Sequence, residues 1–142
     1  GNISKRQSAT NFHFARHGGA CPLWHVHEAF AHPGRILTQV VEMPDGTRFF
    51  GIARTVERGG GGWRRPKKLF AIGLGCELSQ ARELVYADGI DLDDPPEVMP
   101  IGPGCRVCPR PDCVQRAFPP AGKPLVPDSD SESLVPFRFV TS

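Results

Sequence analysis

The sequence Cys105-Arg106-Val107-Cys108-Pro109-Arg110-Pro111-Asp112-Cys113 places three cysteines in one short loop. Its Cys-x2-Cys-x4-Cys pattern lets two sulfurs bind one metal centre from a single turn, and the longer interval lets the chain curve round before the third. Pro109 and Pro111 reduce the entropy that is lost when this loop becomes ordered. A tetrahedral thiolate site needs a fourth ligand, so the rest of the chain has to supply one.

Only Cys21 and Cys76 remain as cysteines that could complete the set. A disulfide framework is not favoured, because five cysteines is an odd number and three of them crowd into one loop. We expect Cys76 to be the fourth ligand, because it stands just before a predicted helix whose N-terminus would stabilise a thiolate. Cys21 is the alternative. His25 could replace a cysteine in a zinc site, although an ordinary buried or surface histidine is the simpler interpretation.

The identity of the metal is open, because four thiolates serve both zinc and iron–sulfur clusters. Structural zinc sites usually combine two paired Cys-x2-Cys arms. Three clustered cysteines and one distant cysteine are more typical of a [4Fe–4S] cluster. Arg106, Arg110 and Arg116 would place positive charge beside such a thiolate-rich site and stabilise it. A reduced loop without metal is the remaining alternative.

The composition indicates one compact domain, with 142 residues of which 39% are hydrophobic and 23% are charged. A net charge of +2 is too small to indicate nucleic-acid binding by this segment. There is no long apolar run and no secretion signal, so we expect a cytoplasmic protein without a membrane partner. We do not expect an enzyme, since the sequence has no nucleophile elbow, P-loop or paired-carboxylate motif.

The chain predicts an α+β fold with an antiparallel sheet of three or four strands and one or two helices on one face. Asp45-Gly46 is a hairpin signal between the first two predicted strands. A GAF-like or PAS-like sensor topology and a cysteine-rich C-terminal loop complete the expected architecture. Helices are predicted at residues 23–30 and 78–88, strands at residues 35–43, 47–56 and 69–74, and a short edge strand at residues 137–140.

The second and third predicted strands each have a bulky face and a nearly bare face. Alternation gathers Gly51, Ala53, Ala71, Gly73 and Gly75 on the bare faces. A closely packed helix and a ligand cavity both explain this pattern. Basic residues near these strands could bind phosphates beside the bare face, although most surface cations are simply solvated. These are Arg35, Arg54, Arg64, Arg65, Lys67 and Lys68.

Five segments of the chain together resemble the C-terminal domain of the short-chain fatty acyl transcriptional regulators, which are XRE-type helix-turn-helix proteins. The resemblance extends from about residue 11 to about residue 120, and the cysteine motif is its most specific part. The segments are Gly18-Gly19-Ala20-Cys21-Pro22, His27-Glu28-Ala29-Phe30 with Pro33-Gly34-Arg35, Ile72-Gly73-Leu74-Gly75-Cys76, Tyr86-Ala87-Asp88-Gly89, and Cys105-Arg106-Val107-Cys108 through Arg116-Ala117-Phe118-Pro119.

The resemblance implies transcription regulation through sensing of coenzyme A or a short-chain acyl-CoA, with a [4Fe–4S] cluster in this domain. It also implies homo-oligomers, with DNA bound only by a separate N-terminal part. The implied cluster ligands are Cys105, Cys108, Cys113 and Cys76, with Cys21 as the alternative to Cys76. For the coenzyme A pocket we expect Arg35, Arg54, Lys67, Lys68, Gly73 and Gly75.

These expectations divide the chain into three parts. Residues 1–10 are expected to be a linker, residues 11–120 a regulatory sensor domain with its cysteine loop at 105–113, and residues 121–142 a C-terminal tail in which Ser129 to Glu132 are solvated. The alternative function is a structural zinc-binding interaction module that senses no small molecule.

Overall fold

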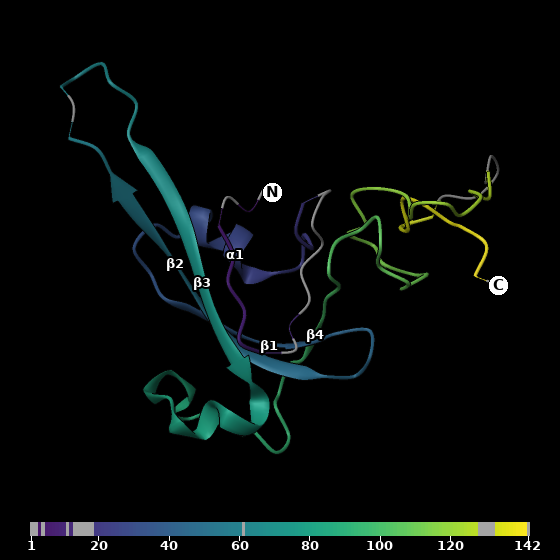
Figure 1. Cartoon of the computed structure of the whole chain (residues 1–142), viewed down its shortest axis with the longest axis horizontal. Coiled ribbons are helices and arrows are strands. Elements are labelled where there is room, and N and C mark those ends of the chain that lie inside the picture. Colours follow the sequence, from purple (N-terminus) through teal and green to yellow (C-terminus); the bar gives the residue numbers. More distant parts are fainter. Residues whose placement is uncertain are drawn as a thin grey trace. The chain divides into compact units, whose positions relative to one another are not determined.

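A computed structural model describes residues 3, 5–10, 12, 19–60, 62–127 and 133–141 (Figure 1). Gly18 of the first family-like segment and the predicted solvated stretch from Ser129 to Glu132 fall outside these residues. In the part that is described, no helix is long and apolar enough to cross a membrane.

Four strands form one sheet in the order β3-β2-β1-β4. They are β1 (Leu37–Glu42), β2 (Arg48–Arg58), β3 (Lys68–Glu77) and β4 (Met99–Pro100). The first three confirm the predicted strand positions. The Asp45-Gly46 turn joins β1 to β2, and Gly46 has a φ of 86°, a conformation that glycine adopts without strain. β2 and β3 pair antiparallel along their length and form the long hairpin of Figure 1.

Two predictions about the sheet were wrong. The sheet is mixed and not wholly antiparallel, and its fourth strand is β4 in place of residues 137–140. Phe139 makes only an isolated antiparallel bridge with Leu125. β4 has only two residues, so it shows no alternating pattern in the sequence. It follows a long connection from β3, so no tight turn determines whether it runs parallel or antiparallel to its neighbour. The GAF-like or PAS-like topology stays a prediction.

The first predicted helix is present as α1 (His25–Glu28), which continues as the 3-10 helix η1 (Ala29–Ala31). The second prediction was wrong in type, because residues 78–88 form two 3-10 helices, η2 (Leu78–Glu83) and η3 (Val85–Ala87). Leu84 separates them with an extended backbone, at φ −100° and ψ 128°. Such short turns depend on tertiary packing more than on helical periodicity.

The chain divides into two compact units. Unit 1 comprises residues 1–23, 42–47 and 100–142, and unit 2 comprises residues 24–41 and 48–99. The core of unit 2 is formed by Val40, Phe50, Ala81 and Ala87. In unit 1 the most deeply buried apolar residue is Ile101, which is 1% exposed.

Candidate metal centre and ligand cavity

Unit 1 contains Cys21 together with the three cysteines of the loop. Cys21, Cys105 and Cys108 are all buried, while Cys113 is half-buried. Burial raises the pKa of Cys21, and the charges of Cys105 and Cys108 raise it further, whereas backbone hydrogen bonds with Gly102 and Leu23 oppose the rise.

The backbone beside Cys108 is shaped around its sulfur. A Cβ atom at Gly102 would lie 2.5 Å from Cys108 Sγ and 3.0 Å from Cys108 Cβ, which is closer than real side chains approach. The Sγ of Cys105 accepts a hydrogen bond of 3.4 Å from the backbone N–H of Ala117. N–H donors of this kind stabilise a thiolate in metal sites.

Arg116 binds backbone carbonyl oxygens of the cysteine loop. Its side chain is only 3% exposed. It donates hydrogen bonds to the backbone oxygens of Cys105 at 2.6 Å, Arg110 at 2.7 Å and Cys108 at 3.0 Å. The guanidinium therefore fixes the backbone at two of the three loop cysteines, Cys105 and Cys108.

Described residues of the predicted tail pack against this arginine. The Phe139 ring lies 5.0 Å from the Arg116 guanidinium carbon and 5.4 Å from Lys123 Nζ, and Phe139 is itself buried. Val126 donates a backbone hydrogen bond of 2.9 Å to Arg138, which closes the tail on itself. Residues beyond 120 thus belong to the same packed unit as the cysteine loop.

Cys76 has different surroundings, because it packs against the core of unit 2. Burial raises the pKa of its thiol, and the carboxylate of Glu77 raises it further. The helix N-terminus that would have stabilised a thiolate is absent, since η2 is a short 3-10 helix that begins two residues later. The reason for preferring Cys76 over Cys21 therefore fails.

In the part of the chain that is described, no group of three or more His, Cys, Asp or Glu side chains is arranged to hold one metal ion. The fit of the cysteines to a metal group rests on the burial of Cys21, Cys105 and Cys108 within unit 1 and on the loop carbonyls that Arg116 holds. These features suit a thiolate centre, whether cluster or zinc.

The bare face of the hairpin is covered by the segment around α1. A Cβ atom at Gly73 would lie 3.3 Å from the Trp24 ring, and one at Gly51 would lie 3.2 Å from the His25 ring. Close packing of the segment around α1 accounts for the glycines at these two positions.

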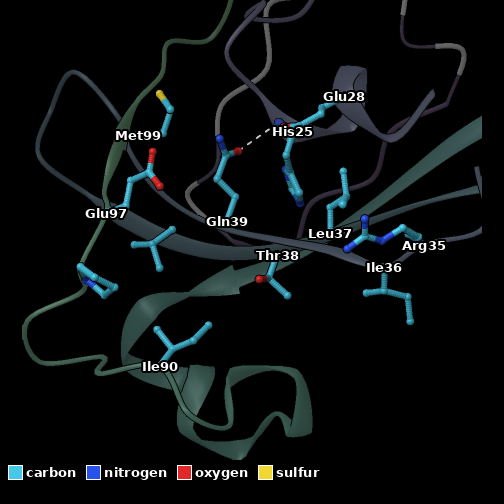
Figure 2. A pocket seen from close by; sticks show the side chains of 12 residues that line it. His25, Glu28, Arg35, Ile36, Leu37, Thr38, Gln39, Ile90, Glu97 and Met99 are labelled. Atoms are coloured by element: carbon cyan, nitrogen blue, oxygen red, sulfur yellow. Dashed lines mark hydrogen bonds between the residues drawn. The ribbon is translucent and has the colours of Figure 1, made fainter. Parts of the chain in front are cut away.

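Unit 2 contains a cavity along β1 instead, with a volume of about 450 Å³ (Figure 2). The six consecutive residues 35–40 line it, so both faces of the strand contribute. His25 reaches it from α1, and the backbone N–H of His25 donates a hydrogen bond of 3.0 Å to Gln39 Oε1. The other lining residues are Glu28, Ile90, Pro96, Glu97 and Met99.

His25 is 4% exposed, and neither of its ring nitrogens makes a well-aligned hydrogen bond to a described residue. Burial lowers its pKa, while Glu28, Gln39 and nearby backbone groups partly oppose this. The cavity is therefore lined by a buried imidazole ring whose nitrogens have no well-aligned hydrogen-bond partner among the described residues.

Of the six residues expected to bind coenzyme A, only Arg35 lines this cavity. Arg54 and Lys68 are exposed on the hairpin. Lys67 forms an ion pair of 2.7 Å with Glu57. Gly73 faces Trp24, and a Cβ at Gly75 would lie 3.3 Å from the Phe50 carbonyl oxygen. The sequence analysis did not predict His25, Thr38, Gln39 and Glu97 as cavity residues. They come from segments that are distant in the sequence, and no local motif marks the cavity.

Residues 1–137 match the family described as "Short-chain fatty acyl coenzyme A regulator, C-terminal". The chain belongs to this family. It is 54% identical over 137 residues to the HTH-type transcriptional regulator PrpR of Mycobacterium tuberculosis, covering 96% of this chain and 28% of that protein. The match thus extends beyond residues 11–120, where the sequence motifs lie.

Two further proteins are similar to the chain. The propionyl-CoA carboxylase regulator of Cereibacter sphaeroides is 52% identical over 140 residues, which cover 99% of this chain and 30% of that protein. A solved Mycobacterium tuberculosis transcriptional regulator is 54% identical, with a TM-score of 0.86, and the match covers 97% of this chain and 42% of that one. The chain spans under a third of the curated relatives' length, and their printed names describe regulators and no enzyme.

Proposed function

We propose that the chain is the regulatory part of a bacterial transcription factor that controls short-chain acyl-CoA metabolism. Its family membership and the regulators to which it is similar support this role. The DNA would be bound by another part of the protein, and the chain would influence that part by coupling between sites, without catalysis.

The proposed cofactor is a [4Fe–4S] cluster held by Cys21, Cys105, Cys108 and Cys113. The observation that carries this proposal is the burial of Cys21 beside Cys105 and Cys108 in unit 1. When bound, such a cluster supplies a redox-active centre. The chain's own residues provide the thiolates and, through Arg116, the fixed backbone that presents them.

The proposed ligand site is the cavity along β1, which would take the acyl-thioester end of coenzyme A. Its lining mixes apolar side chains with the polar groups of His25, Thr38 and Gln39, which suits a short acyl chain followed by amides. Glu28 and Glu97 disfavour phosphates within the cavity, so Arg35 is the residue that would meet the anionic part.

Metal analysis and calorimetry test the two halves of this proposal separately. Anaerobically purified protein is expected to be coloured by sulfur-to-iron charge transfer and to contain iron and sulfide. Colourless protein with stoichiometric zinc would favour the structural zinc module.

Titration with propionyl-CoA is expected to release heat, and the Arg35→Ala variant is expected to bind more weakly. The matched control is Arg54→Ala, because Arg54 is exposed and does not line the cavity. Equal weakening by both variants, or no heat with coenzyme A or any short-chain acyl-CoA, would refute sensing at this cavity.

A further inference from the structure

The β2–β3 hairpin concentrates the positive charge of the chain. Residues 48–76 contain seven Arg and Lys residues and one acidic residue, which gives a formal charge of +6, whereas the whole chain carries +2. The residues outside the hairpin therefore have a net charge of −4. The small net charge of the chain conceals a strongly basic hairpin, whose electrostatic field attracts polyanions.

Five of these cations are exposed and form no ion pair with a described residue. They are Arg54, Arg58, Arg64, Arg65 and Lys68. Glu57 is the one acidic residue of the hairpin, and its carboxylate lies 2.7 Å from Lys67 Nζ. The hairpin itself therefore supplies no further carboxylate to neutralise the other five side chains.

Three of the five cations lie on the face of the hairpin that α1 does not cover. Arg54 and Arg58 are four residues apart on β2, so they share a face, and Lys68 is the β3 partner of Arg58. Gly51 and Gly73, against which the segment around α1 packs, lie on the opposite face. The basic face is therefore open to a partner on the side away from α1.

The other two cations, Arg64 and Arg65, lie in the loop that closes the hairpin. They follow Trp63, which is 97% exposed, and the Arg65 N–H donates a backbone hydrogen bond of 3.0 Å to the Gly62 carbonyl. Within unit 2, this closed end projects past α1, at the upper left of Figure 1. The hairpin thus carries its unpaired cations along one face and at its tip.

We propose that this basic hairpin binds the phosphate backbone of double-stranded DNA without reading its sequence. A two-stranded β-ribbon fits the major groove of B-DNA, and Arg and Lys side chains neutralise phosphates. The relatives of this chain are named as helix-turn-helix transcriptional regulators, so a duplex is a polyanion that such a protein meets. A lipid surface fits less well, because Trp63 is the only large apolar residue of the tip at residues 59–68, and membrane binding scales with buried apolar area.

The composition of the hairpin makes the contact independent of sequence. Asn, Gln, Asp, Ser and Thr side chains read base edges, yet residues 48–76 contain none of the first four, and their one threonine, Thr55, is buried. Phosphate contacts position a protein on the duplex and leave specificity to other parts of it. The contact uses neither the proposed cysteine site nor the cavity, so its failure leaves the proposed function standing.

Fluorescence anisotropy of labelled duplexes, titrated with the 142-residue chain between about 0.05 and 0.2 M salt, tests the proposal. Each neutralised phosphate contributes about −0.9 to the slope of log K against log salt, so five contacts predict a slope of about −4.5. Two duplexes of unrelated sequence are expected to bind equally, within about twofold. No binding at the lowest salt, or a preference of about tenfold or more for one duplex, would overturn the proposal.

Charge removal at the tip locates the contact. The double variant Arg64→Ala with Arg65→Ala is expected to reduce the slope to about −2.7 and to weaken binding about tenfold or more at 0.1 M salt. Arg64→Lys with Arg65→Lys keeps both charges and is expected to keep the wild-type slope, because phosphate contacts need charge more than guanidinium geometry.

The matched control removes the same charge from unit 1. Lys5→Ala with Arg106→Ala changes two exposed cations outside the hairpin and is expected to leave the slope unchanged. Equal weakening by the control and by the alanine variant at the tip would overturn the proposal, because binding would then follow net charge. Sedimentation with vesicles of equal parts phosphatidylcholine and phosphatidylglycerol completes the test, and binding to vesicles without binding to DNA would overturn it as well.

Discussion

Arg116 is the charged residue on which the cysteine loop depends. It is buried, and it donates to three carbonyl oxygens of the loop. The sequence suggested that arginines here would act through charge near the thiolates, and the structure adds that Arg116 acts through hydrogen bonds to the backbone. Neither its burial nor these partners follow from the loop sequence, because Phe139, which stacks on it, is 23 residues away.

Arg116→Ala is expected to destabilise the protein by about 3 kcal/mol or more, because it leaves buried carbonyl oxygens without a donor. Arg106→Ala is the matched control in the same loop. Arg106 is exposed and stacks on Phe118 at 4.7 Å, so its removal is expected to cost less than about 1 kcal/mol. Urea denaturation measures both, and equal losses would contradict the role of Arg116.

The burial of His25 predicts how the free energy of unfolding depends on pH. Burial lowers its pKa below the ordinary 6.5, so the folded state binds the proton more weakly than the unfolded state does. The unfolded state therefore gains protons first as the pH falls. The free energy of unfolding is expected to decrease as the pH drops below about 6.5 and to be flat above it.

Urea denaturation of wild type and His25→Gln between pH 5.5 and 7.5 tests this expectation. The free energy of unfolding of the variant is expected to change less with pH than that of wild type, whatever the variant's absolute stability. His32→Gln is the control, because His32 is only half-buried and lies near Glu28 at 3.7 Å. A His25→Gln slope that equals the wild-type slope would show that His25 does not carry the effect.

At the scale of elements, the sequence predicted correctly those strands and turns that depend on neighbouring residues. The Asp45-Gly46 turn and the β-branched stretches around it fixed β1 and β2, since turn geometry and alternation act over a few residues. The bare face of β2 and β3 was compatible with either a closely packed helix or a ligand cavity, and Gly51 and Gly73 are in close contact with a packed segment. That segment contains Trp24 and His25, and the contact is set by tertiary packing.

Elements that depend on distant contacts were missed or mistyped. η2 and η3 share the apolar spacing of one α-helix, but the extended Leu84 divides them, and Ala81 and Ala87 are both buried. β4 exists because Ile101 and its neighbours pair with the end of β1, where the Ile101 N–H donates to the Glu42 carbonyl at 3.0 Å. Two residues carry no periodic signal.

At the scale of the whole molecule, the candidate metal centre and the cavity belong to different units. Cys21 and the cysteine loop lie in unit 1, while the cavity residues lie in unit 2. The sequence identified three of the four proposed ligands, because they share one loop. It did not select Cys21, since the approach of residue 21 to residue 105 is a property of the folded unit.

This division predicts where metal removal acts. Chelation under anaerobic conditions is expected to increase amide hydrogen exchange in residues 100–127, because the metal would be part of the packing of unit 1. Exchange in the paired strands β2 and β3 is expected to change little, since their hydrogen bonds lie within unit 2. Equal deprotection of both regions would contradict the assignment of the metal to unit 1.

The central claim is that Cys21 completes the cysteine site, and paired cysteine variants test it most directly. Iron and acid-labile sulfide should be measured in anaerobically purified wild type, Cys21→Ser and Cys76→Ser. The account predicts that Cys21→Ser loses most of its iron and its visible absorbance, while Cys76→Ser retains both at the wild-type level. Loss in Cys76→Ser with retention in Cys21→Ser would contradict the account.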